Sequence, residues 1–342
     1  MYAFLRPLLF RLDPEHAHTL TLGLLRLAGN FPVTNSLITW LFETPAKPVT
    51  AFGLTFKNRV GLAAGYDKNG VAVNGLAALG FGHIEVGTVT RLPQAGNPKP
   101  RVHRVPAAQA VVNAMGFPNN GVDELLKESK KWKVDSRSAF HSPKIGINLG
   151  KGKATPLEKA AEDYCALLER VHACADYVAI NLSSPNTPGL RQLQTRVYLE
   201  GLLQAVVKVR NTLTPRVPLL VKLAPDLSEA ELDEVLTVVT ALGIDGLIAT
   251  NTTVSRVALA PPAAQTLAGG LSGAPLTQRS TEVIHYLARR TALPIIGVGG
   301  ILNAADAQAK LDAGATLIQI YTGLVYAGPG LVKAINLKVR EA

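Results

Sequence analysis

The sequence predicts a closed (β/α)8 TIM barrel with an N-terminal helical extension. Eight short apolar runs have the character of buried strands, and helical patterns lie between most of them from about residue 58 onward. About eight strand–helix units over this length suit a closed barrel better than an open sheet. The expected strands are Val60–Ala64, Ile84–Thr88, Lys144–Asn148, Tyr177–Asn181, Leu219–Leu223, Gly246–Thr250, Pro294–Val298 and Leu317–Tyr321.

Most of the connections between these strands carry helical periodicity. One stretch, from Arg91 to about His141, is too long for a simple connection, so it is expected to pass over the mouth of the barrel. It contains an extended segment over Arg101–Val105 and a helical pattern over Asp123–Lys131. The other expected helices are Pro156–Val171, Val197–Leu213, Ser228–Leu242 and Leu276–Arg290.

Residues 1–44 differ from the barrel segment, residues 45–342. Asp13 and Pro14 form a helix start, with Asp13 as N-cap and Pro14 at the first helical position. Leucines then recur at helical spacing until Gly29-Asn30, where the pattern is expected to break. A second short helix is expected after Thr34 as its N-cap.

These N-terminal helices leave two interpretations open. None of their segments is an uninterrupted apolar span long enough to cross a bilayer, and no secretory cleavage site follows them. With Arg6, Arg11 and Arg26 among apolar residues, they suit a segment lying on a membrane surface. The alternative is a helical cap packed on the main domain.

The amino-acid composition excludes some kinds of site but does not identify the ligand. The 342 residues are 47% hydrophobic, enough for a large core, and the only cysteines are Cys165 and Cys174. Their spacing argues against a disulfide framework, a zinc site or a cysteine-ligated iron–sulfur cluster, and no metal site is expected. The net charge of +10 leaves nucleic acid, an anionic membrane and acidic small molecules open as partners.

Polar residues concentrate where the predicted strands end. The loop from Asn181 to Leu190, Asn-Leu-Ser-Ser-Pro-Asn-Thr-Pro-Gly-Leu, follows the strand Tyr177–Ile180. Alone, it is most simply a turn. Other strand ends, however, also carry amides, hydroxyls and lysines, and chemistry in this fold is done at the carboxyl ends of strands. Those ends hold Ala63 to Gly70, Gly87 to Thr90, Asn148, Lys222, Thr250 to Thr252, Gly297 to Ile301 and Tyr321 to Gly323.

These strand ends suggest a phosphorylated ligand and a planar polar one. Glycines over Gly297–Ile301, with Tyr321-Thr322-Gly323, can form a phosphate cup at the last two strands. Lys68 and Lys222 would lie near the barrel axis, where a flavin phosphate, a reduced flavin ring or a carboxylate could offset them. A structural ion pair is the alternative, for Lys68 with Asp67. Four asparagines could surround a pyrimidine-like ring: Asn113, Asn181, Asn186 and Asn251.

Over essentially its whole length the sequence resembles the membrane-associated, quinone-dependent (class 2) dihydroorotate dehydrogenases. The motifs that carry the resemblance are Gly61–Lys68, Glu85–Thr90, Asn181–Leu190, Val221–Asp226, Thr250–Thr252, Gly269–Gly273 and Ile296–Ile301. The family keeps its catalytic base at the position of Ser184, where its soluble class has cysteine. The resemblance therefore implies an oxidoreductase that oxidises dihydroorotate to orotate in pyrimidine biosynthesis, with one FMN per chain as hydride acceptor and a membrane quinone as final electron acceptor.

The resemblance also implies which residues do this. The flavin-contacting positions of the family fall on Ala63, Ala64, Gly65, Tyr66, Asp67, Thr88, Asn148, Asn181, Lys222, Thr250, Gly273, Gly300, Tyr321 and Thr322. The substrate-contacting positions fall on Lys68, Asn113, Ala114, Met115, Gly116, Phe117, Asn181, Asn186, Asn251 and Thr252. Ser184 would take the C5 proton through a relay, because a free serine is a poor base, while Lys222 would stabilise charge on the flavin.

The implied quinone, ubiquinone or menaquinone, would enter between the N-terminal helices, at positions that fall on His18 and Arg104. The resemblance implies peripheral attachment through these helices to the cytoplasmic face of the cell membrane, and no nucleic-acid partner. Two residues depart from the family pattern: Ala114 replaces an arginine, and Tyr66 replaces an apolar residue. The alternative function is an FMN-dependent tRNA-dihydrouridine synthase-like barrel, for which this chain lacks a suitable cysteine.

Overall fold

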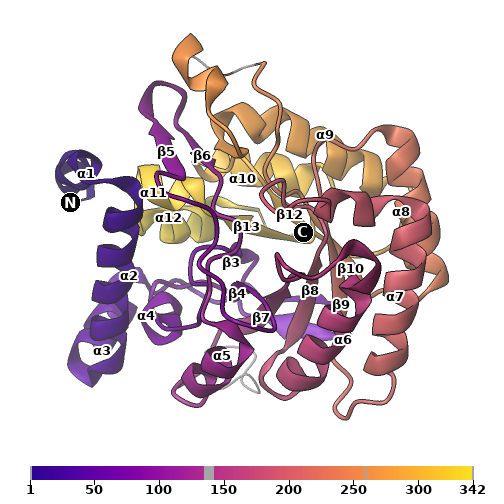
Figure 1. Ribbon diagram of the computed structural model, residues 1–342. Coiled ribbons are helices and arrows are strands. Elements are labelled where there is room, and N and C mark those ends of the chain that lie inside the picture. Colours follow the sequence, from indigo (N-terminus) through magenta and orange to yellow (C-terminus); the bar gives the residue numbers. More distant parts are fainter. Residues whose placement is uncertain (1, 135–141, 258, 260, 341–342) are drawn as a thin grey trace.

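Eight parallel strands close into a barrel in the computed structural model of the chain, which describes residues 2–134, 142–257, 259 and 261–340 (Figure 1). The ring order is β10-β12-β13-β3-β4-β7-β8-β9, so each strand pairs with its neighbour in the chain and the last pairs with the first. The predicted fold class is confirmed, and each expected strand agrees with an observed one to within two residues at either end. The strands are β3 (Val60–Leu62), β4 (His83–Val89), β7 (Lys144–Leu149), β8 (Tyr177–Asn181), β9 (Leu219–Leu223), β10 (Gly246–Ala249), β12 (Ile295–Val298) and β13 (Leu317–Ile320).

The strand register brings polar residues to one rim of the barrel. Asn181 at the end of β8 pairs with Lys222 in β9, and Gly87 in β4 pairs with Asn148 in β7. Because all eight strands are parallel, their carboxyl ends share this rim. Residues that are far apart in the sequence therefore face a common space.

Helices surround the barrel and bury the apolar residues between the two layers. The fully buried Leu167, Leu203 and Val235 lie on the inward faces of three of them. Ser228 begins one helix with a capping box, since its hydroxyl accepts from the Glu231 N–H while Glu231 accepts from the Ser228 N–H. The helices are α4 (Val73–Ala78), α6 (Ala160–Val171), α7 (Arg196–Arg210), α8 (Glu229–Ala241), α9 (Thr277–Ala288), α10 (Ala304–Asp312), α11 (Thr322–Ala327) and α12 (Gly330–Lys338).

Two small antiparallel sheets lie outside the ring. The hairpin of β1 (Val49–Ala51) and β2 (Leu54–Phe56) packs Phe56 against His83 and so covers the amino-terminal end of the barrel. At the other end, β5 (Val102–Val105), β6 (Ala110–Asn113) and β11 (Gly270–Gly273) form a three-stranded sheet.

The predicted excursion over the mouth contributes two of the three strands of this second sheet, β5 and β6, while β11 comes from a later part of the chain. Its expected extended segment is β5, and its expected helix is α5 (Gly121–Ser129). The expected end of the excursion, near His141, lies outside the described residues.

The N-terminal extension consists of three helices along one side of the barrel, beside α4 and the β5–β6 hairpin (Figure 1). They are α1 (Tyr2–Arg11), α2 (Pro14–Asn30) and α3 (Pro32–Phe42). Asp13 caps α2 as predicted, accepting from the N–H groups of Glu15 and His16. In the described part of the chain, no helix combines the length and apolar character needed to cross a membrane.

The helix α2 ends at Asn30, so the break expected at Gly29-Asn30 is confirmed. Gly29 lies in the last turn, where a Cβ would come within 2.2 Å of the Gly75 nitrogen in α4, so this glycine also permits a close helix crossing. The expected N-cap of the next helix was wrong. Thr34 is not an N-cap, because α3 begins two residues earlier with Pro32 at its first position, and the Thr34 hydroxyl donates back to the Ala28 and Phe31 carbonyls.

Candidate active site

A polar cavity of about 1090 Å³, mouth included, occupies the carboxyl rim of the barrel. Most of the residues singled out from the sequence line this cavity. They are Ala63, Ala64, Gly65, Lys68, Thr88, Asn113, Met115, Gly116, Phe117, Asn181, Ser184, Asn186, Lys222, Thr250, Asn251, Thr252, Gly273, Gly300, Tyr321 and Thr322.

Four of the expected flavin- and substrate-contacting residues do not line the cavity. Asp67 is fully buried, and its carboxylate accepts from the N–H groups of Val71 and Ala72, so it closes the turn after β3. Asn148 lies one layer deeper, where it hydrogen-bonds to the Thr88 hydroxyl and accepts from the Asn181 amide.

The other two, Ala114 and Tyr66, contact neighbouring segments instead. Ala114 contributes only backbone there, donating to the Arg101 carbonyl at 2.7 Å and accepting from Asn97 at 2.9 Å. Tyr66 turns toward the N-terminal helices, with its ring edge-on to His18 at a centroid distance of 5.0 Å.

The cavity also has lining residues that sequence reasoning missed. Ser272 stands inside the motif Gly269–Gly273, so motif membership was the available signal. Gln319 was hidden within a strand. Val102 and Val111 come from the β5–β6 hairpin, and their segment was expected to pass over the mouth although neither residue was named as a site residue. Leu276 and Ile320 were also missed, whereas Val298, Gly299, Ile301 and Gly323 lie within the phosphate cup expected from the sequence.

A glycine cradle forms one end of the cavity. Gly299 has φ of 120° and Gly300 has φ of 69°, both in the region that favours glycine. A Cβ at Gly300 would come within 2.1 Å of the Thr277 hydroxyl, at the start of α9, and that hydroxyl donates to the Gly300 carbonyl. The loop is thus drawn against the α9 terminus, where backbone N–H groups favour an anion.

A buried lysine supports this cradle from behind. Lys310, in α10, is fully buried and donates to the Thr277 carbonyl and to the hydroxyls of Ser280 and Thr281. Burial lowers the pKa of Lys310 to about 7. The Ser280 hydroxyl in turn donates to the Gly299 carbonyl at 3.0 Å, so the lysine and the glycine loop share one hydrogen-bond network.

An amide network forms the centre of the cavity. The Asn181 amide donates to the Thr88 hydroxyl at 3.0 Å, and its carbonyl oxygen accepts from Ser183 and from the Asn251 amide at 3.3 Å. The Asn251 amide also donates to the Ser183 hydroxyl at 2.9 Å. These contacts fix the rotamers of Asn181 and Asn251, so that both side chains present polar edges in defined directions.

A second amide pair lies toward the mouth. The Asn186 amide donates to the Asn113 carbonyl oxygen at 3.0 Å, which connects the loop after β8 to the β6 strand. Asn97 connects the same two segments through its own amide, donating to the carbonyls of Ala114 and Asn186. The four asparagines found in the sequence therefore form two pairs, one deep and one near the entrance.

Lys222 has an acidic partner that the sequence did not indicate. Its ammonium lies 3.4 Å from Glu85 Oε1, and both side chains are almost completely buried. Glu85 also accepts from Asn148 at 2.8 Å and from Gln319 at 2.8 Å. The expectation that an anionic ligand must offset Lys222 was therefore wrong, because β4 supplies the counter-charge from across the barrel.

Lys68 is held differently. Its ammonium donates to the Gly65 carbonyl at 2.8 Å, and among the described residues it forms no ion pair with Asp67, so that structural alternative does not hold. Burial lowers the pKa of Lys68 to about 8, while Glu15 and Asp67 act in the opposite direction. A carboxylate ligand would stabilise the charged form of this lysine.

The Ser184 side chain is 5% exposed and faces the cavity. Its hydroxyl oxygen accepts a hydrogen bond from the Asn186 N–H at 3.2 Å. Phe117, on the mouth side of the same cavity, has φ of 52°, a left-handed conformation that is uncommon for a bulky residue and that occurs at functional sites.

His18 and Arg104 lie outside this cavity, next to the N-terminal helices. Burial lowers the pKa of His18 to about 4, so its ring is neutral near pH 7. Arg104 donates to the carbonyls of Leu9 and Leu12, and its guanidinium lies 4.7 Å from the centre of the Phe10 ring. Tyr66 joins the two regions, since its ring contacts both His18 and Tyr321.

Comparisons with known proteins agree with this arrangement. The sequence profile of the dihydroorotate dehydrogenase family matches residues 47–342. A protein of Chromobacterium violaceum described as dihydroorotate dehydrogenase (quinone) is 51% identical over 340 residues, covering 97% of this chain and 95% of that protein. One of the same description from Acidithiobacillus ferrooxidans is 50% identical, covering 98% and 93%. Among solved structures, that of DHODH in complex with ferulenol from Eimeria tenella has a TM-score of 0.87 at 33% identity, covering 98% of this chain and 96% of that one.

A closed barrel with a polar cavity at its strand ends defines an enzyme of the (β/α)8 class. The chain belongs to the dihydroorotate dehydrogenase family, in the quinone-dependent group. It is an oxidoreductase that oxidises dihydroorotate in pyrimidine biosynthesis, with dihydroorotate and a quinone as its two substrates. The alternative of a tRNA-dihydrouridine synthase-like barrel finds no support in these comparisons.

Proposed function

We propose that this chain oxidises dihydroorotate to orotate with one FMN per chain as hydride acceptor, and that a membrane quinone takes the electrons onward. The observation that carries the proposal is the composition of one continuous cavity. It combines a glycine cradle suited to a phosphate, two pairs of asparagines, a buried serine and two lysines.

The residues present fit FMN. Gly299 and Gly300 allow the loop after β12 to lie against the start of α9, where backbone N–H groups favour a phosphate. Among the described residues, the side-chain oxygen of Gln319 is buried in the cavity wall without a hydrogen-bond partner. When bound, FMN supplies a flavin ring that accepts a hydride and passes electrons on. The residues that would hold it are Ala63, Ala64, Gly65, Thr88, Asn181, Lys222, Thr250, Gly273, Gly300, Tyr321 and Thr322.

The asparagines and Lys68 would hold the substrate. Each amide offers a donor and an acceptor, which suits the alternating carbonyl and N–H groups of a dihydropyrimidine ring. The Lys68 ammonium, which has only a neutral carbonyl as its hydrogen-bond partner here, can pair with the substrate carboxylate. Asn113, Asn181, Asn186, Asn251 and Thr252 line the same part of the cavity, together with Met115, Gly116 and Phe117.

Ser184 would act as the base that removes the C5 proton. Because its oxygen already accepts from the Asn186 N–H, the hydroxyl is held in one orientation, and the same contact stabilises negative charge on that oxygen. A water or neighbouring hydroxyl would carry the proton away, since serine is a weak base at its free pKa. The Lys222 ammonium, positioned by Glu85, would stabilise negative charge on the reduced flavin.

Residues 1–44 would form a separate segment for membrane attachment and quinone access, with residues 45–342 as the FMN barrel. Twelve of the eighteen exposed large apolar side chains in the described chain fall between Phe4 and Leu41, although the helices α1–α3 make up only a small part of the chain. Such a surface suits the interfacial region of a bilayer. Peripheral attachment at the cytoplasmic face of the cell membrane would bring ubiquinone or menaquinone to His18 and Arg104. The proposed partners do not include nucleic acid.

Anaerobic titration of the purified protein with dihydroorotate tests the proposal. We expect a flavin absorption spectrum that bleaches with near-stoichiometric substrate and recovers on addition of a short-chain quinone. A yellow protein that does not bleach would leave the flavin barrel but remove the substrate assignment. A colourless protein that cannot be reconstituted with FMN would contradict the cofactor assignment and everything that depends on it.

A further inference from the structure

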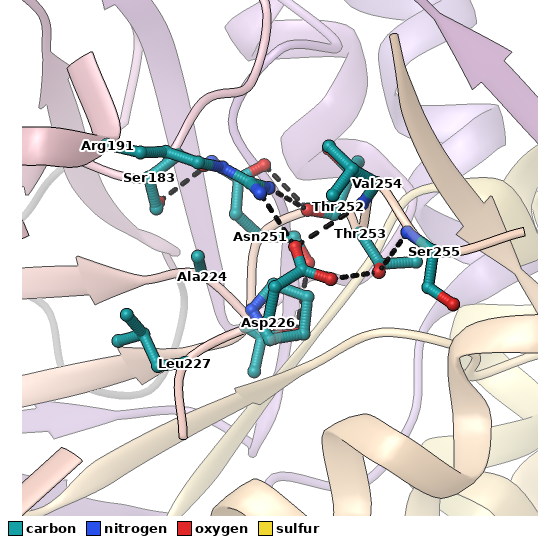
Figure 2. Close-up of polar contacts among 12 residues, drawn as sticks. Ser183, Arg191, Ala224, Asp226, Leu227, Asn251, Thr252, Thr253, Val254 and Ser255 are labelled. Carbon is teal, nitrogen blue, oxygen red and sulfur yellow. Dashed lines mark hydrogen bonds and ion pairs between the residues drawn. The ribbon is translucent and has the colours of Figure 1, made fainter. Parts of the chain in front are cut away.

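Arg191 connects the three loops that follow β8, β9 and β10 (Figure 2). It lies in the short 3-10 helix Leu190–Gln194, beyond the polar loop after β8. Its guanidinium donates to the Ser183 carbonyl at 3.1 Å, to the Thr252 carbonyl at 2.9 Å and to the Asp226 carboxylate at 2.8 Å. One side chain thus satisfies acceptors from three separate segments.

Asp226 extends the same connection to the loop after β10. Its carboxylate accepts from the Thr253 hydroxyl and from the Val254 N–H at 3.3 Å, while the other contact is with Arg191 (Figure 2). Both members of the ion pair are about three-quarters buried, with side-chain exposures of 24% and 23%. Water therefore competes less for these contacts than at an exposed pair.

The acceptors of Arg191 are next to the groups proposed to act on the substrate. Ser183 precedes Ser184, and its carbonyl belongs to the peptide group that leads into the base. Thr252 follows Asn251, whose amide donates to the Ser183 hydroxyl. Yet Arg191 and Asp226 do not line the cavity themselves. Their geometry places them behind the reacting groups, where they set the distance between the β8 and β10 loops.

We propose that Arg191 and Asp226 are positioning residues for the reaction, and that they hold the Ser184 loop against the Asn251 loop at the separation that proton removal requires. This inference rests on the proposed function. Loops are the mobile parts of a barrel, and a misplacement of about 1 Å can cost about a hundredfold in rate. A guanidinium with fixed, planar donors is suited to such a contact, whereas a lysine carries a compact charge on a flexible stem and lacks the planar fork.

The test uses Arg191→Gln, Arg191→Lys, Asp226→Asn and the double variant of Arg191→Gln with Asp226→Asn, each as FMN-loaded protein. The readouts are the single-turnover rate of flavin reduction by dihydroorotate, its pH profile, the dissociation constant of orotate from the flavin spectrum, and thermal melting. Arg170→Gln is the matched control, because it removes an exposed arginine–aspartate pair with Asp123, outside the cavity.

We expect the reduction rate of Arg191→Gln to fall by about tenfold or more, with a smaller fall for Arg191→Lys and with FMN content unchanged. The double variant should lose less than the product of the two single effects, because the two residues share one contact. The apparent pKa of the rate profile should shift as Ser184 loses its orientation. The control should match the unmodified chain.

A lowered melting temperature with a reduction rate within about threefold of the unmodified chain would overturn the proposal, since the pair would then serve stability alone. If Arg191→Gln does not retain FMN, the rates of Arg191→Lys and Asp226→Asn decide by the same criterion. If dihydroorotate fails to reduce the flavin of the unmodified chain, the proposed function itself fails. The two failures are therefore distinguishable.

Discussion

At the residue scale, the position of Ser184 shows how this site would compensate for a weak base. Its oxygen accepts from the Asn186 N–H, and the Asn186 side chain is itself held by Asn113. A short network therefore runs from the base to the β6 strand at the mouth. Hydroxyl orientation is thus decided by contacts from two segments, which is what a reaction that depends on proton position requires.

Substitution of Ser184 with alanine should slow single-turnover flavin reduction by about two orders of magnitude or more, because the proton acceptor is removed. FMN should remain bound, since Ser184 is not among its proposed contacts and most of those contacts lie on other strand ends. Stopped-flow absorbance under anaerobic conditions measures the rate. A matched control is Ser255→Ala, which removes a serine hydroxyl that does not line the cavity. An unchanged reduction rate in Ser184→Ala would refute the assignment of the base.

Lys68 makes a second residue-scale prediction, on pH. Its pKa near 8 means that the free protein carries the charge below pH 8 and loses it above. An anionic ligand binds the charged form, so orotate affinity should be constant below pH 8 and fall by up to about tenfold per unit above it. Lys68→Met should bind orotate more weakly at pH 7 and remove this dependence, while Lys127→Met, on the surface of α5, should not. A pH-dependent affinity that persists in Lys68→Met would contradict the prediction.

At the element scale, the close crossing of α2 and α4 fixes the N-terminal helices to the barrel. A Cβ at Gly75 would come within 2.1 Å of the Leu25 carbonyl oxygen, and one at Gly29 would meet the Gly75 backbone. Backbone atoms cannot move aside as a flexible side chain can. The two glycines therefore determine how near α2, which carries His18, lies to the loop that carries Tyr66 and Lys68.

Gly75→Ala should displace α2 from α4 and destabilise the protein by about 1–3 kcal/mol. We expect quinone reduction to weaken more than flavin reduction by dihydroorotate, because α2 carries the proposed quinone contact. Thermal melting and separate half-reaction assays measure the two effects. Gly23→Ala, on α2, is the control for a glycine-to-alanine change outside the crossing, since nothing lies within 4 Å of its Cβ position. Equal losses in both half-reactions would argue that α2 does not serve the quinone step.

At the scale of the whole molecule, charge and apolar surface are unevenly distributed. The N-terminal helices expose Phe4 and Trp40 at 84% and 71% on one side of the barrel, whereas α7 lies on the opposite side (Figure 1). The net charge of +10 favours an anionic surface as partner. Such a molecule would dock with α1–α3 toward the membrane and leave the rest of the barrel in water.

Phe4→Glu and Trp40→Glu should weaken binding to vesicles of mixed neutral and anionic lipid by about tenfold or more. Each variant would replace an apolar side chain in contact with lipid by a charged one. Flotation with vesicles measures the bound fraction. Val197→Glu is the matched control, since Val197 is 82% exposed on α7. Equal weakening by all three variants would show that net charge, and not the N-terminal surface, controls attachment.

The barrel and most of its rim could be predicted from local pattern alone. Strands such as Tyr177–Asn181 and Leu219–Leu223 agree residue for residue, because a buried parallel strand is a continuous apolar run that ends abruptly in polar residues. The fold then brings those ends to one rim whatever the loops do. This is why the residues chosen at strand ends line a single cavity, whereas others that line it, such as Met115 and Phe117, were implied only by the family resemblance.

Long-range pairing is what the sequence alone did not determine. Lys222 has no acid near it in the chain, yet Glu85 lies 3.4 Å away across the barrel. Asp67 is next to Lys68 in the chain, but its carboxylate accepts from backbone N–H groups instead. Gly29 stands where the sequence pattern predicts a helix end, but the structure shows that a glycine is needed at this position because the Gly75 backbone lies against it. Local sequence specifies which groups a segment offers, but their partners come from segments far apart in the chain, and only tertiary packing brings these together.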